Sequence, residues 1–536
     1  MKKINLILIA VLGIFAFSSC DDFLDRKPTN YGDSATAIQT KADAESMIAA
    51  VMNRMTSSNY YGRNLLLYAD AKGGDMVVYS NGRGNDALYN FNHEYNSSAY
   101  GAFWSSGYDL ILQLNTIINR SKEIVAAGAI DNFNDVYGQA YTLRALIYFE
   151  MIRLYGLPYT LHDPSKSLGL PLLTDAIGIK DQPTRSTVQA VYTQIVEDLE
   201  TAKDLISTST KNGFVNYYAN RAIAARVYLT MGNYGAALTA AQKVIDSGKF
   251  KLYTNEEWVE SWQKQFGSES IFELFMNPNE GDLGNSSLGL YYSRAKHFSS
   301  KATGYYGASD AYIARLAEDP TDVRHGIMDF DEDCDAYEES VLQKYYKEGQ
   351  YAKRMGSCYK YLGGCDYFNT GIGSSSAHKA AGVPYRGDYG IFPGDGKDNS
   401  TAVNIKVIRL SEMYLIAAEC ALADGDADAA AEYLQAIRKR SPGLEPATAE
   451  NVTLDMILDE KSKEFYGEGL RYWDMLRLGK EITFNDEILG FVTPHRTQTI
   501  DTKTFYKVIL PIPENELNAN PAIISQQNPG YAVPLR

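Results

Sequence analysis

Apolar residues recur at the spacing of an amphipathic helix in several long segments of the chain. The clearest segment is 220–245, where Gly232 is expected to end one helix just before the next begins. A second pair of helices is predicted in 411–439, with Gly425 between them. Segments 135–154 and 187–205 have the same helical character. The pattern therefore predicts a mostly helical protein whose helices are joined by tight turns.

The segment 220–245 resembles a tetratricopeptide helical hairpin, and so does 411–439. Ala224 and Ala240 are small enough to let two antiparallel helices approach closely, while Tyr228 and Leu229 would fill the seam. Repeats of this kind cannot bury their apolar faces alone, so they should stack on one another. We therefore expect a mostly α fold with about four tetratricopeptide-like hairpin repeats, and a large irregular loop-rich region that carries short strands.

The helical pattern is interrupted between residues 276 and 400, where Gly, Ser, Asn, Asp and Tyr dominate. Segment 507–513 is expected to be extended. Because repeats lie on both sides of the loop-rich region, we expect 31–536 to form one interleaved domain. Its parts are an N-terminal helical repeat part (31–275), a loop-rich ligand-binding region (276–400), and a C-terminal helical repeat and tail (401–536).

The first 19 residues have the features of a lipoprotein signal peptide. Lys2 and Lys3 precede an apolar run at 6–17, which is too short to span a bilayer comfortably, and small residues lead up to Cys20. A thiol at this position can take a diacylglyceryl group, so Cys20 is the predicted lipidation site, followed by a tether at 20–30. An ordinary secretory signal that happens to contain a cysteine is the alternative.

The remaining composition is that of a globular chain in water. Hydrophobic residues make up 45% and charged residues 22%, and no other segment approaches the length of a membrane span. Removing the signal peptide leaves 49 basic against 66 acidic residues, a formal charge of −17. Nucleic acid is therefore not expected as a partner, and a strongly anionic ligand is mildly disfavoured.

Cysteines and acidic strings give no firm metal site, and no cofactor is expected. Cys420 lies in an apolar stretch, where a small buried side chain is the expected role. One disulfide among the three remaining cysteines is plausible, with all three pairings open: Cys334, Cys358 and Cys365. The acidic string 424–428 is interpreted as helix-capping aspartates. The string 329–335 is interpreted as an acidic surface, with a calcium site left open.

Common catalytic signatures are missing from the sequence. It holds no Gly-x-Ser-x-Gly elbow, phosphate loop, His-Glu-x-x-His motif, or glycine fingerprint after a strand. Two carboxylates on different loops could still meet as in a glycoside hydrolase, but nothing in the sequence singles out such a pair.

Tyrosine is unusually frequent, with 40 residues in 536, about twice the ordinary share. Many tyrosines fall in the expected loops. A tyrosine offers a flat apolar face and a hydroxyl at small conformational cost. Sugar rings present patches of C–H groups ringed by hydroxyls, so an arc of such faces suits an oligosaccharide. Packing of the loops onto the helices is the alternative for any single tyrosine.

Several fragments, in the same order along nearly the whole mature chain, resemble the SusD/RagB family of Bacteroidota. They are CDDFLD at 20–25, FW at 103–104 with NTIIN at 115–119, RLSEMYLIAAE at 409–419, EFYGEGLRYWDMLR at 464–477, and LPIP at 510–513 with NP at 520–521 and NPGY at 528–531. The helical spacing of 460–477 would bury Phe465, Leu470, Trp473 and Leu476, while its charged residues pair along the helix. We interpret that segment as scaffold, and Trp104 as a packing residue with a ligand role left open.

The resemblance implies a surface-exposed outer-membrane lipoprotein without catalytic activity. Such a protein captures glycans, or peptides in some members, and caps a SusC-like TonB-dependent transporter. The acidic pair after Cys20 is similar to signals that send lipoproteins to the cell surface. The residues we expect to bind ligand lie in a first loop and a second loop: Asp75, Tyr79 and Arg83, then Tyr291, Tyr292, Tyr305 and Tyr306. A peptide-binding member of the family, a surface glycoside hydrolase and a protein-interaction scaffold stay open as alternatives.

Overall fold

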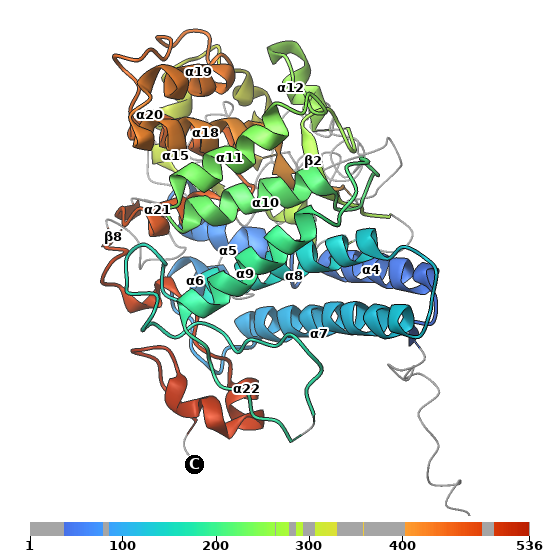
Figure 1. The fold of residues 1–536 in the computed structure, drawn as a ribbon. Helices are drawn as coiled ribbons and strands as arrows, with labels where there is room; N and C mark the ends of the chain where they lie inside the picture. The colour runs from blue at the N-terminus through green and yellow to red at the C-terminus, as the bar shows by residue number, and fades with distance from the viewer. Residues whose placement is uncertain are drawn as a thin grey trace, which may run out of the picture.

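A computed structural model describes the chain at residues 37–78, 85–178, 180–262, 264–277, 283, 286–292, 306–329, 357–358, 403–484 and 498–534. Four helix pairs form its scaffold (Figure 1). The pairs are α4 (Lys41–Met55) with α7 (Ser98–Ala126), α8 (Asn134–Tyr155) with α9 (Val188–Lys203), α10 (Tyr217–Thr230) with α11 (Tyr234–Ile245), and α18 (Leu410–Asp424) with α19 (Ala427–Arg438).

Neighbouring pairs pack against each other in series. Helix α7 lies on α8, α9 on α10, and α11 on α18, although 164 residues separate the last two in the sequence. Helix α20 (Leu454–Glu464) closes the series by packing on α18 and α19. The predicted mostly helical, tetratricopeptide-like fold is confirmed. Among the described residues, no helix is both long and apolar enough to cross a membrane.

Turn chemistry explains where two of the hairpins bend. Gly232 has φ +72° and Gly425 has φ +86°, a left-handed conformation that glycine adopts at little cost. Asn233 accepts a hydrogen bond from the Ala236 N–H, and Asp426 accepts one from the Ala429 N–H, so each following helix begins with a side-chain cap. The capping interpretation of 424–428 is confirmed at Asp426.

The strands described by the structure form four short antiparallel pairs. They are β1 (Met76–Val78) with β3 (Tyr306–Ala308), β2 (Ser270–Leu274) with β6 (Ile405–Arg409), β4 (Met328–Asp329) with β5 (Ser357–Cys358), and β7 (Ile482–Phe484) with β8 (Gln498–Ile500). Shorter helices connect them: α5 (Asn64–Lys72), α6 (Asn85–Tyr89), α12 (Asn255–Ser261), α14 (Leu288–Tyr292), α15 (Asp310–Ala317), α21 (Arg471–Arg477) and α22 (Glu514–Ala519).

The prediction of one helix through 460–477 is wrong. Helix α20 ends at Glu464 and α21 begins at Arg471, and the chain turns between them at Gly467 (φ +80°) and Gly469 (φ +71°). Glu464 and Glu468 therefore do not pair along a helix but both bind Arg409 on β6. Phe465, Trp473 and Leu476 are buried as expected, whereas Leu470 is half-buried.

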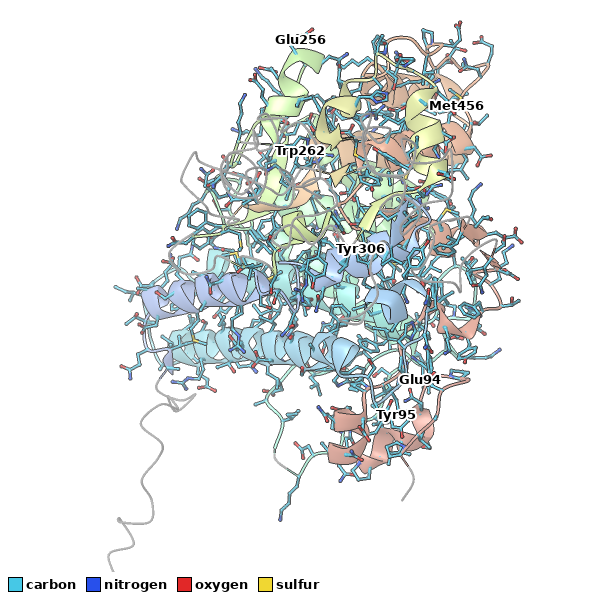
Figure 2. All side chains as sticks on the ribbon, turned by 180° about the vertical axis from the view of Figure 1, so that it is seen from behind. Glu94, Tyr95, Glu256, Trp262, Tyr306 and Met456 are labelled. Carbon is cyan, nitrogen blue, oxygen red and sulfur yellow. The ribbon has the colours of Figure 1, made fainter. Side chains whose placement is uncertain are left out.

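The segment predicted to be extended is so only in part. Tyr506–Val508 forms the short 3-10 helix η6, and extended backbone begins at Ile509. The Leu510 N–H donates to the Leu154 carbonyl at the end of α8, so this segment lies along the helical scaffold. A second 3-10 helix, η7, covers Pro521–Gln526. Glu94 and Tyr95 lie beside these C-terminal elements, at the opposite end of the molecule from Glu256 and Met456 (Figure 2).

A buried ionic cluster joins the segment between α11 and α18 to the C-terminal helices. Arg324, on the 3-10 helix η2 (Val323–Ile327), is 0% exposed. Its guanidinium donates two hydrogen bonds to the Asp322 carboxylate, from Nε at 2.8 Å and from Nη2 at 2.7 Å. It also lies 2.6 Å from Glu460 on α20. Arg440, just after α19, pairs in turn with Glu269 at 2.6 Å. Buried ion pairs therefore connect η2 to α20, and the segment after α19 to the segment before β2.

Candidate ligand-binding site

The structure brings the ends of the two predicted ligand loops together. Strand β1 ends at Val78, which is paired with Tyr306, the first described residue of β3. The first loop continues from β1 and the second leads into β3, so both adjoin the same end of this two-stranded sheet. Helix α14, from the second loop, contacts β3. We call β1, β3 and α14 the site frame; Figure 2 labels its Tyr306 in the middle of the molecule.

Asp75 anchors the site frame to the rest of the fold. Its carboxylate accepts hydrogen bonds from Arg315 Nη1 at 2.8 Å and Ser462 Oγ at 2.7 Å, and its side chain is buried. Burial alone would raise the pKa of the Asp75 carboxyl, but Arg315 and then Arg471 more than offset this, so the pKa lies below the ordinary 3.8. The carboxylate is therefore charged and engaged, with little surface for a ligand.

Tyr292 is placed in the same way. Its side chain is 1% exposed, and its hydroxyl donates to Asp70 Oδ2 at 2.6 Å. The other oxygen of Asp70 accepts the Gly469 N–H at 2.9 Å, in the turn between α20 and α21. Tyr292 thus ties α14 to α5 and, through Asp70, to the C-terminal turn.

The remaining described tyrosines of the prediction are also buried. Tyr306 is 1% exposed in β3, and Tyr291 packs with the Arg63 guanidinium 4.6 Å from its ring centre. Arg63 in turn donates to the Ser286 carbonyl at 3.3 Å. The ligand role of these side chains stays a prediction that their burial does not favour, because stacking on a sugar needs an open ring face.

Tyr79, Arg83 and Tyr305 lie outside the described residues, and their ligand role stays a prediction. Tyr79 and Tyr305 adjoin the site frame in sequence, since residue 79 follows β1 and residue 305 precedes β3. Sequence reasoning missed the residues that support this frame, Arg315 and Ser462. They lie 240 and 387 positions from Asp75, and no local pattern marks them.

The structure describes only some of the residues in the other predicted sites. Cys420 is buried with a free thiol. Cys334 and Cys365 lie outside the described residues, as does most of the acidic string 329–335, so the disulfide and calcium alternatives stay open. Trp104 is buried on α7, and its indole N–H donates to Glu516 Oε2 at 3.1 Å, which supports the packing role.

Comparison with known families finds two matches that together cover most of the chain. Residues 343–531 match the SusD family, and residues 22–229 match a SusD-like family described as starch-binding and associating with the outer membrane. The second match covers α4 to α9, all but the last residue of α10, and the first predicted ligand loop.

Solved structures and curated relatives agree over nearly the full length. A SusD superfamily protein from Bacteroides vulgatus ATCC 8482 is 31% identical, with a TM-score of 0.74 over 92% of this chain and 100% of its own. One from Bacteroides thetaiotaomicron VPI-5482 is 30% identical, with a TM-score of 0.75 over 91% and 100%. SusD-like protein P2 of Formosa agariphila is 25% identical over 99% of this chain and 100% of its own. The chain therefore belongs to the SusD family of carbohydrate-binding proteins.

Proposed function

We propose that this protein captures oligosaccharides at the cell surface without transforming them, and delivers them to a SusC-like TonB-dependent transporter in the outer membrane. Cys20 carries the lipid that holds it there. Two acyl chains or more anchor stably, whereas one chain holds marginally, so a fully acylated Cys20 would keep the protein beside its transporter.

The observation that carries the proposal is the pairing of Val78 with Tyr306 on the scaffold of a carbohydrate-binding family. This pairing makes one candidate site from two loops that are more than 200 residues apart in the sequence. Tyr79 and Tyr305 are the sequence neighbours of β1 and β3, and Arg83 belongs to the first loop. Their side chains would supply the chemistry that a sugar requires: ring faces for C–H groups, and a cation that donates hydrogen bonds to hydroxyls.

Binding without catalysis agrees with the two described carboxylates that contact or adjoin the site frame. Asp70 and Asp75 both serve as hydrogen-bond acceptors in the interior. A glycoside hydrolase needs one acid to protonate the leaving group and a second carboxylate across a cleft from it. Carboxylates held by buried donors are poorly placed for either task.

A glycan array with the mature protein tests the proposal. We expect wild type to retain a defined set of oligosaccharides, and the variant Tyr79→Ala/Arg83→Ala/Tyr305→Ala to lose them while keeping its thermal midpoint. The matched control is Tyr506→Ala, at an exposed tyrosine elsewhere on the surface. Retention of peptides and not glycans by wild type would favour the peptide-binding alternative, and shortened oligosaccharides in the eluate would favour a hydrolase.

Partnership with a transporter is tested separately. Affinity purification of the lipidated protein from outer membranes should recover a TonB-dependent transporter in about equal amount. Failure to recover one from membranes of cells grown on the captured glycan would contradict this part of the proposal and leave glycan binding untouched.

A further inference from the structure

A groove of about 700 Å³ lies against the C-terminal half of α4, in a part of the molecule that the site frame does not include. Phe214, Phe266 and Phe275 line it from three separate segments. A hollow of about 220 Å³ adjoins it and shares Phe214 and Phe266 as lining residues. Binding sites for small molecules typically have volumes of about 300–1,000 Å³. The groove thus has room for a saccharide of a few rings.

The groove presents an aromatic face to solvent. Phe275 is 49% exposed, which is unusual for so large an apolar side chain, and its ring is stacked on that of Phe266 with centroids 6.2 Å apart and planes 27° apart. Gly213 lies against the pair: a Cβ there would come within 3.5 Å of the Phe275 Cβ. The 210–214 turn therefore packs closely against one side of the two rings.

Phe266 has a strained backbone conformation. Its φ is +52°, a left-handed conformation that is uncommon for an aromatic residue and costs on the order of 1–3 kcal/mol. The Phe266 N–H donates to Glu273 Oε2 at 2.9 Å, which holds the residue in place. Such strain persists only where the surroundings fix it, and it is concentrated at binding sites.

The accessible charges that line the groove and its adjoining hollow are cationic, although the whole chain carries a formal charge of −15. They are Arg54 in the groove, which is paired with the Asp109 carboxylate, and Lys211 and Lys249 in the hollow. Lys211 Nζ lies 3.8 Å from the centre of the Phe214 ring. The acidic residue among the described lining, Glu273, is 1% exposed and also accepts a hydrogen bond from Asn404. A ligand that extends from the groove into the hollow therefore meets the positive charge of the two lysines.

We propose that this groove is a second saccharide site, selective for sugars that carry a carboxylate or a sulfate. A sugar ring lays its C–H face on Phe275 in the groove, and its acidic substituent extends toward Lys211 in the adjoining hollow. The exposed amides of Asn53 and Asn212 reach hydroxyls. The negative charge elsewhere on the protein does not prevent this, because physiological salt screens charges beyond about 8 Å. The inference rests on the proposed function, glycan capture, and adds a ligand class to it.

Affinity electrophoresis of the mature protein tests the inference. Gels contain an acidic polymer (polygalacturonate, alginate or chondroitin sulfate) or a neutral one (fully methyl-esterified polygalacturonate, dextran or galactomannan). We expect at least one acidic polymer to retard wild type more than every neutral polymer. Phe275→Ala and Phe275→Leu should each weaken that retardation about tenfold, equivalent to about 1.4 kcal/mol. The leucine variant keeps apolar bulk and removes only the flat ring.

Further variants test the charge contact and the location of the site. Lys211→Gln should weaken retardation by the acidic polymer and reduce its dependence on salt, because a charge contact is screened by ions. Lys166→Gln, at an exposed lysine paired with Asp163, and Tyr506→Ala should behave as wild type. Equal retardation of wild type and the Phe275 variants would overturn the inference, as would a preference for neutral polymers, and both results would leave glycan capture standing. Wild type that binds no polymer of either class would contradict glycan capture itself.

Discussion

The substitution Arg324→Met removes the central cation of the buried cluster that joins η2 to α20. The guanidinium is 0% exposed, makes two hydrogen bonds to Asp322, donates to Ser441 Oγ at 2.7 Å and pairs with Glu460 at 2.6 Å. Methionine fits the space without the charge. Asp322 and Glu460 then remain in the interior with the main cation between them gone.

The expected loss of stability follows from the cost of an uncompensated buried charge. Removing one partner of a buried ion pair typically costs about 3–5 kcal/mol. The entropy of unfolding is about 2.1 cal/mol/K per residue, so a chain of about 500 residues has about 1 kcal/mol/K, and the thermal midpoint should fall by about 3–5 °C. Arg120→Met is the matched control, because the Arg120–Glu123 pair lies at the surface and is worth at most about 1 kcal/mol.

Differential scanning calorimetry at pH 7 measures both variants. The double variant Arg324→Met/Glu460→Gln should recover part of the loss, because it removes one of the charges left unpaired. A midpoint for Arg324→Met within about 1 °C of wild type would refute the reasoning. A double variant with a still lower midpoint would show that the loss arises from packing and not from charge.

Further substitutions test the site frame, a hairpin turn and the anchor. The Asp75 pKa is below the ordinary 3.8, so the stability that its charge contributes is present above that pH and lost as the pH falls through the folded-state pKa. Urea denaturation should therefore separate Asp75→Asn from wild type at pH 7, and the difference should shrink as the pH is lowered below 3.8. Tyr292→Phe should cost about 1.5–3 kcal/mol in the same assay, since the Asp70 carboxylate loses a buried donor; an unchanged midpoint would mean that water replaces it. Gly425→Ala, at φ +86°, should cost about 1–2 kcal/mol, and a neutral result would show that the turn relaxes. Cys20→Ser should abolish metabolic labelling with palmitate, and a variant that is still labelled would exclude this cysteine as the lipidation site.

The repeat helices could be predicted because their causes are local. Helical spacing of apolar residues, a glycine after the last turn and a capping Asn or Asp all lie within a few positions of one another, as at Gly232 and Asn233. The break after Glu464 has local causes too, Gly467 and Gly469, but the apolar spacing continues across them and hides it. The contact that stabilises the turn is distant in the sequence, because Glu464 and Glu468 form ion pairs with Arg409, more than 50 residues earlier.

The candidate site was predictable only as far as the loops that form it. A surplus of tyrosines in polar segments is equally consistent with stacking on a ligand and with burial under a loop. Tyr292 can be buried because Asp70, 222 positions away, accepts a hydrogen bond from its hydroxyl. Sequence spacing cannot reveal such a partner. The groove shows the same limit, since Phe275 and Arg54 come to line it, and Lys211 the hollow beside it, only once the chain has folded.

Titration calorimetry of the mature protein with the oligosaccharides that it retains on an array tests the central claim most directly. We expect saturable binding, followed by recovery of each oligosaccharide with its mass unchanged. An absence of heat with every glycan tested, or recovery of shortened products, would contradict the conclusion that this member of the SusD family captures glycans without transforming them.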